Sequence, residues 1–153
     1  LRNGFARIPD MLDKGVKLCI GTDSAGSNNT LNMFGDMNFI CLAHKGNCRS
    51  ATAVSARQAL KMATETGAKA LGFDNTGILK EGYAADLTVM DMKYPSLQPV
   101  NDSVAAMCYS ASGYEVESVM VDGEFLMENR EIKGMDEERI YFECNKAMKR
   151  IDG

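Results

Sequence analysis

Residues 16–29 read Val-Lys-Leu-Cys-Ile-Gly-Thr-Asp-Ser-Ala-Gly-Ser-Asn-Asn and hold the strongest structural signal of the chain. The apolar residues at 16–20 predict a short strand, and the small and polar residues after them predict a loop. Asp23 therefore stands where the predicted strand ends. In barrels of eight alternating strands and helices, catalytic side chains are carried at that end of the strands. An aspartate at the end of a strand is more often a turn or cap residue than a catalytic one, so a catalytic role for Asp23 must be supported by the neighbouring sequence.

Helical patterns lie on both sides of this strand. Apolar residues spaced by three and four predict a helix over 5–14, and Gly15 follows as its stop. A second helix is predicted from about 30 to 45, with Asn28 or Asn29 as its cap. The order helix, strand, carboxylate, helix is half of a repeating α/β unit and favours a parallel sheet.

The pattern changes near Phe73. Before it, a polar loop over 45–52 leads to a helix over 56–63, which one further turn extends to Gly72. After it, residues 77–91 are punctuated by glycines and rich in strand-forming residues. The sequence therefore predicts a change from helices to strands at this point.

The clearest hairpin signal lies in the last third of the chain. Residues 116–121 and 124–132 favour strands and flank Asp122-Gly123. Asp-Gly between two such runs favours the turns that match strand twist, so we interpret Asp122 as a turn residue. A proline-containing loop over 94–102 and a short helix over 103–111 are expected before the hairpin.

A last helix is predicted from Asp136, whose side chain suits the cap and whose acidic neighbours suit the helix dipole. Its expected buried side consists of Ile140, Tyr141, Cys144, Met148 and Ile151.

Composition excludes several classes of protein. The chain has 153 residues, 45% of them hydrophobic and 25% charged, as in soluble globular proteins. Its net charge of −4 offers no basic face for nucleic acid, and no apolar run is long enough to span a membrane. Five cysteines without a Cys-x-x-Cys pair argue against a disulfide framework and a structural zinc site, and favour a cytoplasmic protein with reduced thiols. The start at Leu1 shows no signal peptide and agrees with an internal start.

Two motifs carry a resemblance to a known family. Gly-Thr-Asp-Ser-Ala-Gly-Ser-Asn-Asn at 21–29 resembles the last metal-ligand motif of the amidohydrolase superfamily. The resemblance is greatest to the branch of 5-methylthioadenosine/S-adenosylhomocysteine deaminases and chlorohydrolases, where Gly often stands at the position of Ser24. Residues 77–91 resemble the G-x-L-x-x-G-x-x-A-D-L-x-V-x-D signature with which many amidohydrolases return from the barrel to a small β-sandwich. Either motif alone is modest evidence, and the two at this spacing are strong.

The resemblance implies an α/β fold in two parts. Residues 1–72 would be the C-terminal segment of a (β/α)8 metal-dependent hydrolase barrel, and residues 73–153 part of a small β-sandwich with a terminal helix. Asp86 and Asp91, which belong to the second motif, are assigned structural roles, Asp86 binding turn amides and Asp91 ending a strand.

The implied reaction is hydrolytic deamination or dechlorination of a purine-like or triazine-like ring. One divalent metal, zinc or else iron or manganese, would lower the pKa of a water molecule and so supply hydroxide. Asp23 would be both a ligand of this metal and the carrier of the proton that the leaving group needs. Ser27, Asn28 and Asn29 could reach the substrate, although helix capping alone would explain one of them. Thr22 would support the loop or satisfy backbone groups.

The histidines of such a metal site are missing. The family also uses a His-x-His pair and further histidines on other strands, whereas this chain has the single His44. We expect His44 to be a surface or packing residue. Because a catalytic zinc typically has three protein ligands, the chain alone is expected to be inactive.

We therefore expect a missing N-terminal segment of roughly 250 residues, on the scale of a barrel domain. The complete enzyme is expected to be a homo-oligomer acting on a small heterocyclic substrate. Two alternatives stay open. The chain could be a non-catalytic module acting only in binding or oligomerisation, or an enzyme of the same superfamily with a guanine, cytosine or imidazolone-type substrate.

Overall fold

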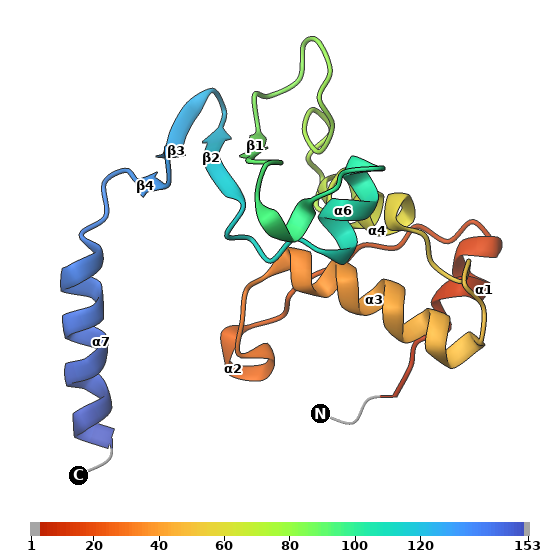
Figure 1. The fold of residues 1–153 in the computed structure, drawn as a ribbon, viewed down its shortest axis with the longest axis horizontal. Coiled ribbons are helices and arrows are strands. Elements are labelled where there is room, and N and C mark those ends of the chain that lie inside the picture. The colour runs from red at the N-terminus through yellow and green to blue at the C-terminus, as the bar shows by residue number, and fades with distance from the viewer. Residues whose placement is uncertain (1–3, 152–153) are drawn as a thin grey trace.

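The computed structural model describes residues 4–151 (Figure 1). The N-terminal half is helical and consists of α1 (Ile8–Asp13), α2 (Ala25–Asn28), α3 (Met33–Cys48), α4 (Ala56–Ala63) and α5 (Glu65–Ala70). The C-terminal half consists of β1 (Leu87–Met90), the 3-10 turn η1 (Pro95–Leu97), α6 (Ser103–Tyr109), β2 (Val116–Val121), β3 (Glu124–Glu128), β4 (Glu131–Ile132) and α7 (Glu137–Ile151). The fold thus combines helices with one small antiparallel sheet.

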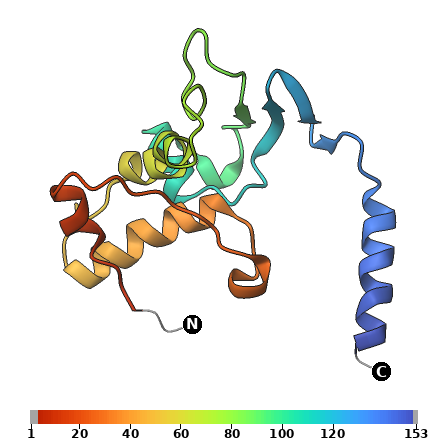
Figure 2. The ribbon, with the colours of Figure 1, turned by 180° about the vertical axis from the view of Figure 1, so that it is seen from behind.

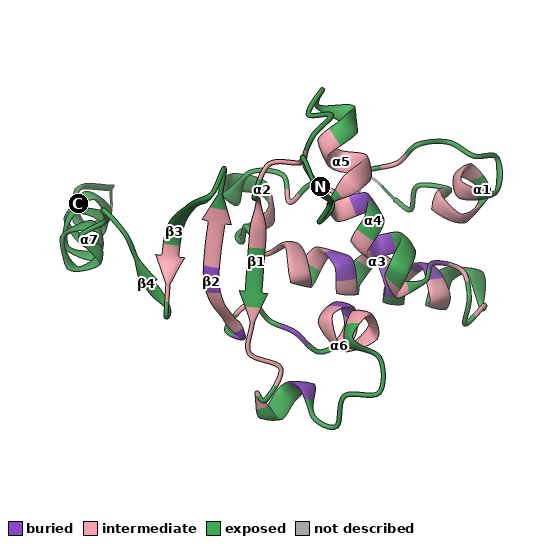
Figure 3. Cartoon of the chain, turned by 90° about the horizontal axis from the view of Figure 1, so that it is seen from above, coloured by how far each residue is buried: buried purple, intermediate pink, exposed green. Residues whose placement is uncertain are grey.

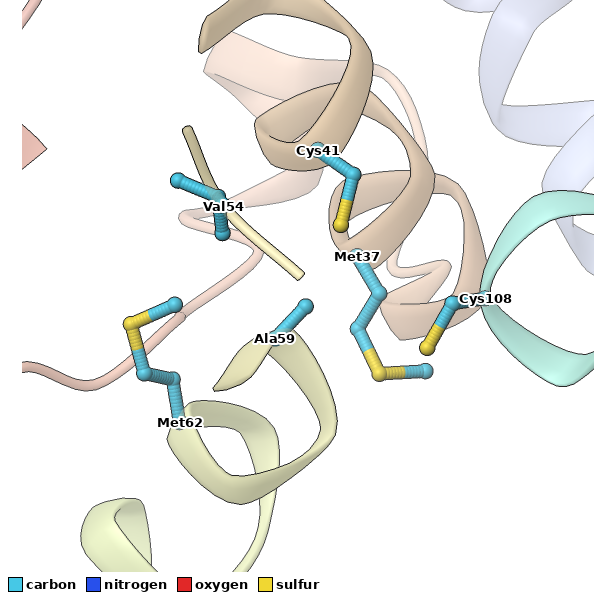
Figure 4. Close-up of a cluster of buried hydrophobic side chains, with 6 residues drawn as sticks. All are labelled: Met37, Cys41, Val54, Ala59, Met62 and Cys108. Carbon is cyan, nitrogen blue, oxygen red and sulfur yellow. The ribbon is translucent and has the colours of Figure 1, made fainter. Parts of the chain in front are cut away.

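The core lies where α3, α4 and α6 meet. Figure 4 shows the six buried side chains of its centre, each at most 3% exposed: Met37, Cys41, Val54, Ala59, Met62 and Cys108. The small Ala59 allows α4 to approach α3 closely. A capping box begins α4, because the Ser55 hydroxyl accepts from the Gln58 amide while the Gln58 side chain accepts from the Ser55 amide.

The sheet is a meander in the order β1-β2-β3-β4, with every neighbouring pair antiparallel. Val121 pairs with Glu124 across the turn, and both turn residues have positive φ, 49° at Asp122 and 82° at Gly123. Positive φ at both positions is the primed turn that Asp-Gly favours. The predicted hairpin and the turn role of Asp122 are confirmed, but the second strand, predicted over 124–132, ends at Glu128, and Glu131–Ile132 form β4 after a turn at Asn129 and Arg130.

Helix α6 connects the two halves of the chain. It lies between β1 and β2 in sequence, yet it packs on α3 and α4. The Asp102 side chain caps it by accepting from the amides of Val104 and Ala105. Residues after 73 therefore contribute to the helical core, and the proposed boundary near residue 72 stays a prediction.

The predicted strand over 16–20 is absent from the structure as a paired strand. Within the described chain, this segment makes two backbone hydrogen bonds. The Val16 amide donates to the Met11 carbonyl, and the Ile20 amide donates to the Met62 carbonyl. A strand is defined by a neighbour, and a parallel neighbour must come from a distant part of the chain. The described residues provide no such neighbour for this segment.

Helix α3 differs from the prediction at both ends. Its cap is Asn32, whose side chain accepts from the Gly35 amide, rather than Asn28 or Asn29. It also continues to Cys48, although a loop was predicted from residue 45. Gly46 and Asn47 are therefore helical. Helix α1 is shorter than the predicted range 5–14.

The expected buried side of α7 was wrong. Figures 1 and 2 show α7 standing apart from the rest of the molecule, and Figure 3 shows it exposed along its whole length. Even Tyr141 and Met148 are 62% and 54% exposed. An amphipathic pattern indicates a face suited to burial but does not provide the surface that covers it. Within residues 4–151, no helix combines the length and the apolarity needed to cross a membrane.

Candidate functional site

Asp23 occupies a left-handed backbone conformation directly after the 16–20 segment. Its φ is +60°, which costs an L-residue roughly 1–2 kcal/mol and which aspartate tolerates better than most. The side chain is exposed, and its Oδ1 accepts from the Ser24 amide at 2.7 Å. The Ser27 hydroxyl and then the Ser24 amide hold the pKa of Asp23 below its ordinary value. Asp23 is therefore an accessible, ionised carboxylate at neutral pH.

The loop after Asp23 folds back into the short helix α2. The Ser24 carbonyl accepts from the amides of Ser27 and Asn28, and the Ser27 hydroxyl donates to the same carbonyl at 3.2 Å. Asn29 ends the helix with a φ of +63°. The Ser27 hydroxyl also lies close enough to Asp23 to lower the pKa of its carboxyl group. The substrate-binding roles of Ser27, Asn28 and Asn29 stay predictions.

Asn28 is tied to its surroundings by its amide group. Its Nδ2 donates to the Thr22 carbonyl at 2.8 Å and lies 3.5 Å from Oδ1 of Asp36 on α3. The Thr22 hydroxyl donates to the Asp23 carbonyl at 3.2 Å, a contact that fits both roles expected of it, supporting the loop and satisfying a backbone group. Sequence reasoning missed Asp36, because an acidic residue in the first turn of a helix is ordinary.

The residues described here do not hold a metal by themselves. Within residues 4–151, no group of three or more His, Cys, Asp or Glu side chains is arranged to hold a metal ion. Asp23 could supply one carboxylate ligand, but three protein ligands are typical of a catalytic zinc. The donor set of residues 4–151 is thus insufficient for the expected metal.

His44 is a packing residue, one of the two roles expected for it. It is 6% exposed, and its ring meets the Phe5 ring edge-to-face at 6.0 Å between centroids. Its Nδ1 is buried without a hydrogen-bond partner in the described part of the chain.

Asp86 performs the structural role predicted for it. Its Oδ1 accepts from the Asp122 amide in the hairpin turn, and its Oδ2 accepts from the Thr76 hydroxyl, both at 2.7 Å. The Asp122 amide first, and the Thr76 hydroxyl second, lower the pKa of Asp86. Asp91 follows the last residue of β1 and accepts from the Lys93 amide, so it ends the strand as expected.

Glu115 is a buried carboxylate that sequence reasoning missed. It is 1% exposed and accepts from the amides of Ser112 and Gly113, each at 2.9 Å, and from the Ser96 hydroxyl at 2.8 Å. Burial is the largest influence and favours the neutral acid, but the hydrogen bonds together outweigh it and lower the pKa of Glu115. The bonds come from residues in a loop and η1, and no local sequence pattern announces them.

Two surface hollows lie away from Asp23. One of about 240 Å³ is lined by residues of α4, by Glu65, Ile78 and Val104, and one of about 220 Å³ lies between α1 and the end of α3. Neither includes Asp23 or residues of the loop after it. The hollows therefore contribute nothing to a substrate site around Asp23.

Comparisons with known proteins agree with the motifs. Residues 1–126 match the model of the amidohydrolase family. The chain is 47% identical over 152 residues to a 5-methylthioadenosine/S-adenosylhomocysteine deaminase of Acetivibrio thermocellus, covering 99% of this chain and 35% of that protein. It is 44% identical to a 5'-deoxyadenosine deaminase of Methanosarcina acetivorans, covering 99% and 35%.

Solved structures show the same kinship. A zinc-bound adenosine deaminase from Xanthomonas campestris superposes with a TM-score of 0.95 at 31% identity, covering 99% of this chain and 35% of that one. A zinc-bound atrazine chlorohydrolase from Arthrobacter aurescens gives 0.86 at 31% identity, covering 94% and 32%. The chain spans about a third of the length of these relatives. The matches confirm the resemblance carried by residues 21–29 and 77–91, and the chain belongs to the amidohydrolase family.

Proposed function

We propose that the chain is part of a metal-dependent hydrolase that deaminates an adenosine-like nucleoside or a related nitrogen heterocycle. Asp23 carries this proposal, because it is an exposed carboxylate of lowered pKa with a positive φ in the loop that follows the 16–20 segment. Strain at a non-glycine residue is a feature of functional sites. The kinship with deaminases supports the reaction class.

The proposed architecture places residues 1–72 in the last part of a (β/α)8 barrel and residues 73–153 in part of a β-sandwich with a terminal helix. The open backbone of the 16–20 segment supports this, since a barrel strand has a neighbour on both sides. A segment preceding this chain would supply the neighbours and the histidine ligands. The complete enzyme is proposed to be a homo-oligomer.

The proposed role of Asp23 follows from its charge and exposure. An ionised carboxylate can serve as one ligand of a divalent metal, zinc or else iron or manganese, and can also accept and return a proton. The metal would supply activation of the attacking water. The Ser27 hydroxyl, the side-chain oxygen of Asn28 and Asn29 would offer hydrogen bonds to the substrate beside it.

Two alternatives remain distinct in their consequences. The insufficient donor set of the described residues favours a non-catalytic module in binding or oligomerisation if no further segment exists. A different heterocycle, such as a guanine, cytosine or imidazolone type, would leave Asp23 essential and change only the substrate profile.

The test is an Asp23→Ala substitution in the complete protein that contains this chain. Deamination of adenosine-like nucleosides is expected to fall well over about tenfold, the equivalent of more than ~1.4 kcal/mol of barrier, while the melting temperature changes little. Asp122→Asn is the matched control, because asparagine also tolerates positive φ and the hairpin turn is remote from the reaction.

Turnover by Asp23→Ala within about tenfold of the parent would contradict the assigned role. If the complete protein hydrolyses neither adenosine-like nucleosides nor guanine, cytosine or imidazolone-type compounds, the result would favour the non-catalytic alternative. Activity confined to guanine, cytosine or an imidazolone would favour the alternative of an enzyme of the same superfamily with a different substrate.

A further inference from the structure

We propose that Asp36 is a positioning residue for Asp23 and acts through the side chain of Asn28. The inference rests on the proposed function, because Asp23 is its object. It adds a residue of α3 to the machinery of the loop at 21–29. The connection consists of three links, from Asp36 to Asn28, from Asn28 to the Thr22 carbonyl, and from that peptide to Asp23.

The link from Asn28 to the loop is the shortest. Nδ2 of Asn28 donates at 2.8 Å to the carbonyl of Thr22, which belongs to the peptide that enters Asp23. A side chain six residues downstream thus holds the backbone immediately before the carboxylate. Asp23 needs such a hold, because its φ of +60° is unfavourable without surrounding contacts.

Asp36 lies where it can orient the Asn28 amide. Its Oδ1 is 3.5 Å from Nδ2 of Asn28, at the long end of the range for a hydrogen bond. The amide group has two hydrogens, so it can serve the Thr22 carbonyl and Asp36 together. If one hydrogen of the Asn28 amide points to Asp36, the rotation of the amide group is fixed. The other hydrogen then stays directed at the Thr22 carbonyl.

The burial of Asp36 has no simpler explanation in the helix. Its Oδ2 is buried and has no hydrogen-bond partner among residues 4–151, an arrangement that is costly for a carboxylate. Capping does not require it, because Asn32 already accepts from the Gly35 amide. The helix dipole favours a carboxylate in this first turn, but an exposed one would serve equally well.

A dipole role and a positioning role predict different measurements. A carboxylate that only stabilises α3 changes the melting temperature and leaves turnover of the folded enzyme unchanged. A carboxylate that positions Asp23 changes kcat, because small displacements of a reacting group reduce the rate of the chemical step strongly. For Asp36→Asn, KM should change less than kcat, since Asp36 is not among the residues proposed to bind the substrate.

The experiment measures kcat, KM, bound metal and melting temperature for variants of the complete enzyme. Asp36→Asn is expected to lower kcat at least about tenfold while KM stays within about threefold and metal content equals that of the parent. Asn28→Asp, which removes the donor and retains Asp36, is expected to lower kcat similarly. The kcat of the double variant should equal that of the less active single variant, because both changes break the same connection.

Asp10→Asn is the matched control, since Asp10 is a carboxylate in the first turn of α1 and is exposed in an ion pair with Arg7. Its kcat should equal that of the parent. The inference is overturned if folded Asp36→Asn keeps kcat within about twofold, if its loss equals its loss of metal, or if the two losses multiply in the double variant. Should Asp36→Asn not fold, Asn28→Asp with parental kcat also overturns it. Failure of the proposed function is separate, because it appears as an active Asp23→Ala enzyme.

Discussion

Glu115 joins two parts of the chain through one carboxylate. It binds the amides of Ser112 and Gly113 beside it in sequence and the hydroxyl of Ser96 in η1. A buried charge is costly unless hydrogen bonds satisfy it, and here they do. The loop that connects α6 to β2 is therefore tied to η1.

Replacing Glu115 by alanine should destabilise the protein by about 3 kcal/mol, because two amides lose a charged acceptor. The control is Glu128→Ala, whose partly exposed ion pair with Lys133 should contribute only about 0–1 kcal/mol. Unfolding in urea measures both. Equal losses for the two variants would contradict the structural role of Glu115.

The same carboxylate predicts a pH dependence. Since the folded-state pKa of Glu115 is lowered, its ionisation contributes stability that is complete above its ordinary pKa near 4.3 and is lost as the pH falls through the folded value. The Glu115→Gln variant should therefore lose less stability than the parent between about pH 5 and pH 3. An acid dependence unchanged by the substitution would contradict this.

At the scale of elements, Gly77 sets how closely the glycine-rich segment approaches α5. A Cβ at this position would lie 2.9 Å from the Glu65 Cα and 3.0 Å from the Ala68 Cβ. Its φ is +84°, which a side chain rarely adopts. Gly82, five residues further along the 77–91 segment, has a similar φ of +81° but open space around it. The two glycines therefore separate close packing from backbone conformation.

Gly77→Ala should cost about 2–4 kcal/mol, because the new methyl group meets the backbone of α5 in addition to its unfavourable φ. Gly82→Ala should cost only about 1 kcal/mol, from φ alone. Denaturant unfolding of the two variants gives the difference directly. Similar losses would show that α5 moves aside and that the contact at Gly77 is not tightly packed.

At the scale of the molecule, large apolar surfaces have no cover from the described chain. Helix α7 exposes Ile140, Met148 and Ile151 at 45%, 54% and 76%, and α3 exposes Phe39 and Leu42 at 68% and 53%. Exposed apolar surface of this extent marks an interface or an aggregation hazard. The proposed remainder of the enzyme would cover it.

The polypeptide of residues 1–153 alone is therefore expected to associate. Size-exclusion chromatography with light scattering should give masses well above the 16.7 kDa of one chain. Replacing Ile140 and Met148 together by aspartate should reduce the association, whereas Lys149→Glu on the charged side of α7 should not. A monomer with a cooperative melt would show that these surfaces need no partner.

The sequence determined the features that depend on residues close together in the chain. The Asp-Gly turn, the helix over 56–63 and a helix beginning at residue 103, predicted to end at 111 and ending at Tyr109, depend on near neighbours, so local patterns were sufficient to predict them. The two motifs were recognised for the same reason, since each is a continuous run of residues.

Only the tertiary structure decided the features that need a distant partner. Within residues 4–151, the 16–20 segment has strand-forming residues but no paired neighbour, and α7 has an apolar side that no described residue buries. Glu115 and Asp36 acquired their roles from side chains and carbonyls brought together by folding, across 19 residues to Ser96 and 8 residues to Asn28. Pairing, burial and hydrogen bonding of this kind depend on three-dimensional position, which residue types and spacing leave open.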